Sequence, residues 1–136
     1  MLTSETKIRV RYAETDQMGV VYHSNYFPYF EVARVESFRQ LGVSYAEIEK
    51  MGVFMPVVDV HARYLRPALY DDLLTIKTSI KELPLHHKVE FHHEVFNEKG
   101  ELLCVSKIIL YFMEKETMKR TNMPEALKKT LERYFQ

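Results

Sequence analysis

The spacing of hydrophobic and polar residues predicts a strand and then a long helix in the first third of the chain. Residues 7–12, KIRVRY, alternate between apolar and polar side chains, which is typical of a half-buried strand with one inward face made of Ile8, Val10 and Tyr12. Residues 26–41 show the three-to-four-residue spacing of a helix. Gly42 follows this segment, and we expect it to end the helix.

The rest of the sequence is mostly strand-like. We expect a short helix at residues 44–50, a final helix opening near Pro124, and four strands between them, at residues 53–65, 72–82, 86–96 and 101–114. Both alternating sets of the last strand are largely apolar, which predicts a central strand covered on both faces. The simplest architecture is an α+β fold, in which one long antiparallel sheet wraps around the single long helix. No second layer of helices is predicted, so we expect another subunit to cover the outer face of the sheet.

Composition limits the classes of partner and of compartment. The chain has 136 residues, which suits one domain spanning residues 1–136. Lys and Arg together number 19, as do Asp and Glu, and this balance argues against nucleic-acid binding. The single cysteine, Cys104, cannot form an internal disulfide, which favours a cytoplasmic protein. We expect no signal peptide and no membrane insertion, because no apolar run approaches the roughly 20 residues that a membrane-spanning helix needs.

The segment TDQMGVVYHSNY, residues 15–26, is the strongest candidate for chemistry. Asp16 lies in a predicted loop directly ahead of the long helix, and Asn25 is the expected N-cap of that helix. Gly19 permits a positive φ, and the loop is anchored by the apolar pair Val20 and Val21. A carboxylate that faces the free N–H groups of a helix N-terminus is suited to attack on a carbonyl, since those dipoles stabilise an oxyanion. The alternative is that Asp16 only shapes the turn.

These residues resemble a known family. The matching positions are Arg9-Val10, Thr15-Asp16, Gly19-Val20-Val21, His23 and Tyr26, followed by residues 31–34 and residues 64–72. They resemble the 4-hydroxybenzoyl-CoA thioesterase branch of the hotdog-fold acyl-CoA thioesterases, most closely its YbgC-like members. The resemblance implies a hotdog fold and hydrolysis of the thioester of an acyl-CoA or an acyl carrier protein. It further implies that no metal or redox cofactor takes part and that the chain forms a homodimer, commonly a dimer of dimers.

The resemblance also implies roles for individual residues. Asp16 would be the catalytic carboxylate, acting as nucleophile or as general base for water, while a backbone N–H near His23 polarises the thioester oxygen. The side chains of His23 and Tyr12 would line the same site. Two alternatives stay open: the His23 side chain only caps the loop, and Tyr12 is an ordinary inward-facing strand residue. We expect further substrate contacts from the loop and helix start, through Gly19, Val20, Val21, Tyr22 and Asn25.

Other chemistry-bearing residues give weaker signals. His61 and Arg63 share one alternating face of the strand at residues 53–65 and could reach a neighbouring subunit's site. The pairs His86-His87 and His92-His93 point to opposite faces of a strand, so we expect no metal site. Arg34 falls on the apolar face of the long helix and needs a buried partner. Two other functions compete with hydrolysis: a non-catalytic protein that binds acyl thioesters, and an enoyl-thioester hydratase.

Overall fold

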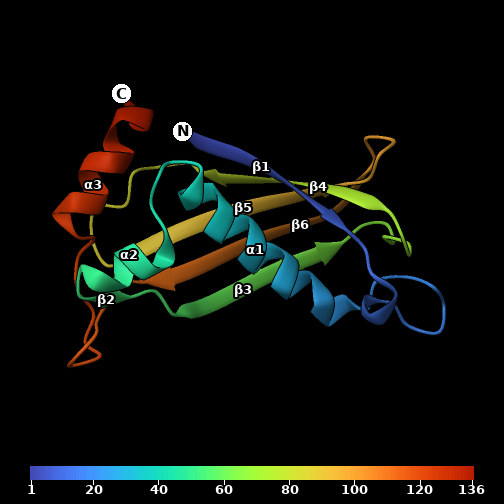
Figure 1. The fold of residues 1–136 in the computed structure, drawn as a ribbon, viewed down its shortest axis with the longest axis horizontal. Coiled ribbons are helices and arrows are strands. Elements are labelled where there is room, and N and C mark those ends of the chain that lie inside the picture. The colour runs from blue at the N-terminus through green and yellow to red at the C-terminus, as the bar shows by residue number, and fades with distance from the viewer.

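The computed structural model describes residues 1–136 and contains a five-stranded sheet with a long helix lying across it (Figure 1). The helix is α1 (Tyr26–Arg39). The strands lie side by side in the order β1-β4-β5-β6-β3, and every neighbouring pair is antiparallel. Their bounds are β1 (Leu2–Arg9), β3 (Val57–Tyr64), β4 (Leu73–Ile80), β5 (Lys88–Phe96) and β6 (Leu102–Tyr111). The predicted α+β arrangement, with one helix wrapped by an antiparallel sheet, is therefore confirmed.

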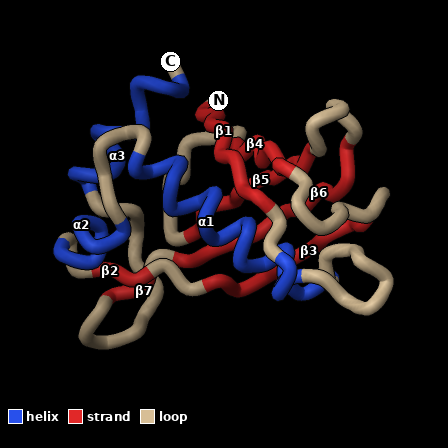
Figure 2. Tube along the Cα trace, turned by 45° about the vertical axis from the view of Figure 1, so that its right-hand side comes forward, coloured by secondary structure: helices blue, strands red, loops and turns tan.

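Short elements complete the chain. Two turns of 3-10 helix, η1 (Tyr12–Glu14) and η2 (His23–Asn25), precede α1, and a third, η3 (Arg133–Phe135), follows the last α-helix. Figure 2 shows β2 (Val53–Phe54) and β7 (Met113–Glu114) together near α2 (Tyr45–Lys50). A last helix, α3 (Glu125–Glu132), lies near the chain end. No helix is both long and apolar enough to cross a membrane.

The hydrophobic core lies between α1 and one face of the sheet, called here the inner face. Phe38 packs edge-on against Phe91 of β5, with ring centroids 5.8 Å apart. Phe30 stacks on His93 of the same strand at 5.0 Å. Neither phenylalanine is more than 1% exposed, so the centre of α1 is fixed against β5. This packing determines where the start of α1 lies relative to the strand ends.

The core also contains a row of polar side chains on neighbouring strands. Thr78 of β4, His93 of β5 and Ser106 of β6 are register partners and are all buried. The Thr78 hydroxyl and the His93 Nδ1 lie 3.1 Å apart. Burial lowers the pKa of His93 to about 3, and the positive charge of Arg34 acts in the same direction. His93 is therefore a neutral core residue.

The long helix and its arginine differ in detail from the prediction. The helix ends at Arg39 rather than at residue 41, although Gly42 does adopt a positive φ of 87° just beyond it. Arg34 is only 6% exposed, as its position on the apolar face of α1 implied. Tyr45 lies close to Arg34: burial raises the pKa of Tyr45, and the charge of the Arg34 guanidinium lowers it.

Three predicted strand boundaries were wrong. The first strand runs from Leu2 to Arg9 instead of residues 7–12, so Tyr12 begins η1. The predicted strand at residues 53–65 is divided into β2 and β3, because Pro56 cannot donate a ladder hydrogen bond. The predicted strand at residues 101–114 is likewise divided into β6 and β7. The strand β6 is not covered equally on both faces. Its outward-facing side chains are only partly buried, namely Val105, Lys107, Ile109 and Tyr111.

Candidate active site

Asp16 begins a tight loop whose hydrogen bonds are mostly internal. The Asp16 N–H donates to the Val20 carbonyl at 2.9 Å, and the Gly19 N–H donates to the Asp16 carbonyl at 3.0 Å. Gly19 adopts a φ of 76°, a left-handed conformation that favours glycine. The Asp16 carboxylate accepts a hydrogen bond of 2.8 Å from the Met18 N–H through Oδ1. One carboxylate oxygen thus shapes the loop, which leaves Oδ2 for other contacts.

The far side of this loop is attached to the segment between β3 and β4. The Val21 N–H donates to the Ala68 carbonyl at 2.8 Å, and the Tyr70 N–H donates to the Gly19 carbonyl at 3.3 Å. Val21 and Ala68 are both buried. The loop that carries Asp16 is therefore held against the body of the fold rather than projecting freely.

The residues after the loop form η2, which runs directly into α1. Because the first N–H groups of a helix have no acceptor within that helix, the N–H groups of His23 and Ser24 are available to a ligand. The Tyr64 hydroxyl, at the end of β3, donates to the His23 carbonyl at 3.1 Å. Asn25 is the N-cap residue of α1, as predicted, but its side chain makes no cap hydrogen bond and instead donates to the Glu14 carbonyl at 2.8 Å.

A cleft of about 360 Å³ connects the Asp16 loop with η2 and the end of β3. It contains four of the residues predicted from the sequence: Asp16, Val20, Val21 and His23. Six further residues complete its lining: Met18, Tyr26, Tyr64, Leu65, Arg66 and Pro67. A carboxylate and a helix start therefore share one cleft, which is the arrangement that attack on a carbonyl requires.

Other predicted residues lie beside the cleft rather than in its lining. Gly19 shapes the turn, and Asn25 binds Glu14 as described above. Tyr22 is 48% exposed, and its ring packs against the His23 ring at 4.4 Å. Tyr12 is 78% exposed and packs edge-on against Tyr70. The interpretation of Tyr12 as an inward-facing strand residue was wrong, because the chain turns into η1 before this position, whereas its role as a site residue stays a prediction.

His61 and Arg63 lie on the outer face of the sheet. His61 is the register partner of Lys107, and Arg63 is the register partner of Val105, both of which point away from α1. Tyr64, on the opposite face of β3, contacts Tyr26 of α1 at 5.2 Å. His61 and Arg63 therefore do not line the chain's own cleft, and the expectation that they reach a neighbouring subunit's site stays a prediction.

Tyr64 and Arg66 are the main cleft residues that were not predicted as site residues. Both fall within residues 64–72, which belong to the matching segments of the sequence, so that segment carried the available signal. The Arg66 guanidinium pairs with Glu101 at 3.0 Å. Burial raises the pKa of Tyr26, at the base of the cleft, to about 12, so its hydroxyl remains protonated at neutral pH.

Metal ligands and thiols play no visible part in the cleft. No three His, Cys, Asp or Glu side chains lie close enough together to hold a metal ion. Cys104 is fully buried in the core, and burial raises the pKa of its thiol to about 12.

A sheet wrapped around one helix, with a carboxylate loop at the start of that helix, defines a hotdog-fold domain of the thioesterase class. The family model described as "Thioesterase-like superfamily" matches residues 10–131. The chain belongs to this superfamily, and the relationship inferred from the sequence is confirmed.

Individual relatives agree with this class. The chain is 38% identical over 119 residues to the "Putative acyl-CoA thioesterase YneP" of Bacillus subtilis, covering 88% of this chain and 86% of that protein. It is 31% identical over 120 residues to the "Acyl-CoA thioester hydrolase YbgC" of Escherichia coli, covering 88% and 89%. Among solved structures, a DHNA-CoA thioesterase from Staphylococcus aureus superposes with a TM-score of 0.89 at 37% identity, covering 99% of this chain and 90% of that chain. These names support the predicted enzyme class, thioester hydrolase.

Proposed function

We propose that this protein hydrolyses the thioester bond of an acyl-CoA to a free acid and a free thiol, with Asp16 as the catalytic carboxylate. One observation carries the proposal: Asp16 and the first turn of η2 line the same cleft. An acyl carrier protein is the alternative carrier of the acyl group. Both carriers present the same thioester to the cleft.

The proposed reaction needs only groups of the chain and water. Asp16 either attacks the thioester carbon directly, forming an anhydride that water then cleaves, or removes a proton from the attacking water. In both routes the carbonyl oxygen gains negative charge, which the N–H groups of His23 and Ser24 stabilise; each such donor is typically worth about 3–4 kcal/mol. The thiolate leaves and takes a proton. No metal or redox cofactor is needed, because a thioester carbonyl is already electrophilic.

The His23 side chain is proposed to orient the substrate or to handle the proton of the leaving thiol. His23 lines the cleft, and its ring contacts the rings of Tyr22 and Tyr64, with centroids 4.4 Å and 6.4 Å away. These aromatic neighbours restrict the directions the imidazole can take. Its backbone N–H contributes independently of its side chain.

The cleft is open, and a second copy of the chain is the proposed cover. β3 is an edge strand, with β6 as its sole neighbour in the sheet. Apolar side chains are exposed along it, namely Val57, Val58, Val60 and Tyr64. A free edge with exposed apolar side chains is a site for strand pairing with another chain. We therefore propose a homodimer formed through β3. Two such dimers would pair through the outer face of the sheet as a further step. The proposed location is the cytoplasm.

The proposal is tested by measuring thiol release from a panel of CoA thioesters by the wild-type protein and by the Asp16→Asn variant. The panel contains short and long aliphatic acyl groups and aromatic ones, since the Staphylococcus aureus relative is named a DHNA-CoA thioesterase. We expect thiol release by the wild type and a large loss of rate in the variant. Binding of acyl-CoA without thiol release would instead indicate a binding protein, and loss of an enoyl absorbance without thiol release would indicate a hydratase.

A further inference from the structure

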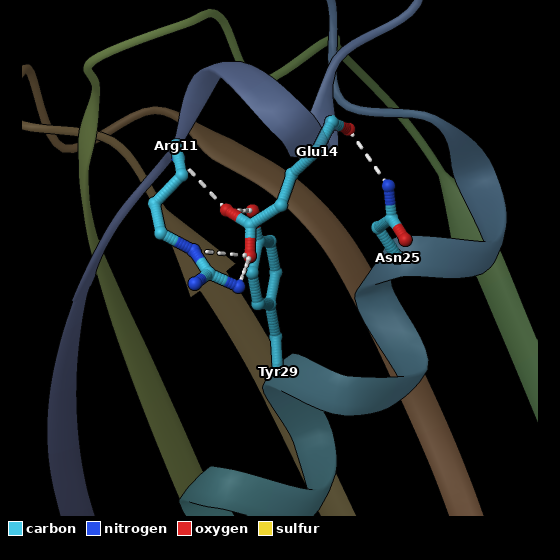
Figure 3. A network of polar contacts seen from close by, with 4 residues as sticks. All are labelled: Arg11, Glu14, Asn25 and Tyr29. Atoms are coloured by element: carbon cyan, nitrogen blue, oxygen red, sulfur yellow. Dashed lines mark hydrogen bonds and ion pairs between the residues drawn. The ribbon is translucent and has the colours of Figure 1, made fainter.

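Glu14, two residues before Asp16, is the centre of a network of polar contacts at the base of the Asp16 loop (Figure 3). Its Oε1 accepts hydrogen bonds of 2.8 Å from the Arg11 backbone N–H and 2.8 Å from the Tyr29 hydroxyl. Its Oε2 accepts from the Arg11 guanidinium, through Nε at 3.2 Å and Nη2 at 3.1 Å. The carboxylate is thereby held by Arg11, the residue before η1, and by Tyr29 of α1.

The backbone of Glu14 makes a second set of contacts, which lead to the start of the helix. Its carbonyl accepts from the Asn25 side chain at 2.8 Å and from the Tyr22 N–H at 2.9 Å. Tyr22 and Asn25 flank His23, whose N–H group is proposed to bind the thioester oxygen. Glu14, the residue directly before the Asp16 loop, is therefore bonded to the residues on both sides of the proposed oxyanion donor.

The charge and burial of Glu14 indicate more than a surface ion pair. Its side chain is only 14% exposed, whereas that of Arg11 is 77% exposed. Burial opposes ionisation of Glu14, but hydrogen bonds from Arg11 and Tyr29 together with the Arg11 charge outweigh it and lower the pKa of Glu14. Burial raises the pKa of Tyr29, and so does its bond to Glu14, so its hydroxyl stays a donor. A half-buried carboxylate with this many donors has a defined position.

The packing of Tyr29 extends this network to the cleft. Tyr29 is only 2% exposed, and its ring lies edge-on to that of Tyr26 at 5.9 Å. Tyr26 lines the cleft together with Asp16. Glu14 itself does not line the cleft, so its carboxylate acts through the backbone and through Tyr29 rather than on a substrate.

We infer that Glu14 is a positioning residue for the hydrolysis: it fixes the distance between the Asp16 carboxylate and the N–H groups at the start of η2. This role rests on the proposed function of Asp16. The loop between Thr15 and Val21 is short and closes on itself through a bridge between these two residues. The loop therefore moves as one unit. A shift of η1 relative to α1 carries the loop with it and changes the distance between Asp16 and His23. Displacements of about 1 Å in a catalytic constellation cost on the order of 10²-fold in rate.

The test compares kcat and KM for CoA thioester hydrolysis in Glu14→Ala, Glu14→Gln and Tyr29→Phe. We expect kcat to fall about 10–100-fold in Glu14→Ala while KM changes by less than about threefold, because orientation and not binding is lost. Glu14→Gln keeps one acceptor oxygen and is expected to recover part of kcat. Tyr29→Phe removes only the hydroxyl that donates to Glu14, so we expect it to fold with the same core. It tests the contact between Glu14 and α1 even if Glu14→Ala does not fold. Its kcat is expected to fall about threefold or more.

The matched control is Glu36→Ala, which removes a carboxylate ion-paired with Arg39 on the same helix and away from the cleft. Its kcat should equal that of the wild type. Unchanged kcat in both Glu14→Ala and Tyr29→Phe, or a rise in KM at constant kcat, overturns the inference. Wild-type rates in Asp16→Asn would instead refute the role of Asp16. The double variant Glu14→Ala/Asp16→Asn separates the two further, since a positioning residue adds little once Asp16 is absent, whereas an equal loss in both backgrounds contradicts positioning.

Discussion

The Tyr64 hydroxyl donates a hydrogen bond of 3.1 Å to the carbonyl oxygen of His23. This contact joins the end of the edge strand β3 to the first residue of η2, across 41 positions of sequence. It restrains the peptide that follows His23, which carries the Ser24 N–H. The helix start is therefore held from two sides, by Tyr64 and by Glu14.

Replacement of Tyr64 by phenylalanine is predicted to lower both kcat and stability. Tyr64→Phe keeps the edge-on packing against Tyr26 but removes the donor to His23. The net loss of one hydrogen bond is about 0.5–1.5 kcal/mol. We expect kcat to fall about threefold to tenfold with little change in KM. Steady-state kinetics and urea unfolding measure both effects. Tyr134→Phe near the chain end serves as the control, and an equal fall in its kcat would contradict the role of Tyr64.

Two substitutions of Asp16 are predicted to separate loop structure from catalysis. Asp16→Asn keeps an oxygen that accepts the Met18 N–H, whereas Asp16→Ala loses it. Both variants should lose about 10²–10⁴-fold in kcat, as expected for a nucleophile or base. Only the alanine variant should also lose about 1 kcal/mol of unfolding free energy. Urea denaturation beside kinetics distinguishes them. A stable, active Asp16→Ala protein would leave Asp16 without either role.

Much of the fold was predictable because hydrophobic spacing reports which residues are buried. The order of one strand, one long helix and a run of strands follows from that pattern alone. Strand ends were less predictable: Arg11 and Glu14 cap a helical turn at Tyr12, and Pro56 interrupts the predicted strand because it has no N–H for a ladder hydrogen bond. Alternation also could not specify which face of β3 points inward, so the structure was needed to place His61 and Arg63 on the outer face.

The candidate site was predictable only where one short segment contains it. Asp16, Val20, Val21 and His23 are close in sequence, so the loop was recognisable as a unit. Tyr64 reaches the same cleft from the end of β3, and this proximity is a property of the tertiary fold. Its assignment required the structure.

Substitution of Gly19 is predicted to disturb the Asp16 loop through backbone strain alone. Gly19 has a φ of 76°, and an added Cβ would meet no atom within 4 Å. Gly19→Ala should therefore cost about 1–2 kcal/mol, the penalty of a left-handed alanine. Gly100 has nearly the same φ, 77°, and equally open surroundings in the turn between β5 and β6. Gly100→Ala should lose similar stability in thermal unfolding while keeping wild-type kcat, whereas Gly19→Ala should lose kcat as well.

The single cysteine is predicted to be unreactive in the folded protein. Cys104 is fully buried, and burial raises its thiol pKa to about 12. The thiolate is the reactive species, so at neutral pH very little is present. A thiol reagent should therefore modify Cys104 only after denaturation, when one thiol per chain appears. Rapid modification of the native protein would contradict this burial. The same property keeps Cys104 from contributing to assays of released CoA.

Acidification is predicted to destabilise the fold through His93. Burial lowers the pKa of His93 from 6.5 to about 3, so the folded protein keeps it neutral while the unfolded chain binds a proton below pH 6.5. The unfolded state then binds more protons, and the free energy of unfolding falls as the pH falls. The slope is about 1.4 kcal/mol per pH unit between about 6.5 and 3. Its full contribution is present above pH 6.5.

Urea unfolding of the wild type and of His93→Phe between pH 7 and pH 5 tests this prediction. Phenylalanine preserves an aromatic ring between Phe30 and Phe91 but cannot take up a proton, although it leaves the Thr78 hydroxyl without its partner. His93→Phe should therefore be less stable at pH 7 by about 1 kcal/mol but lose about 2 kcal/mol less than the wild type on acidification. His86→Gln, at an exposed position, should follow the wild type. An identical acid sensitivity of His93→Phe and the wild type would contradict the burial of a neutral histidine.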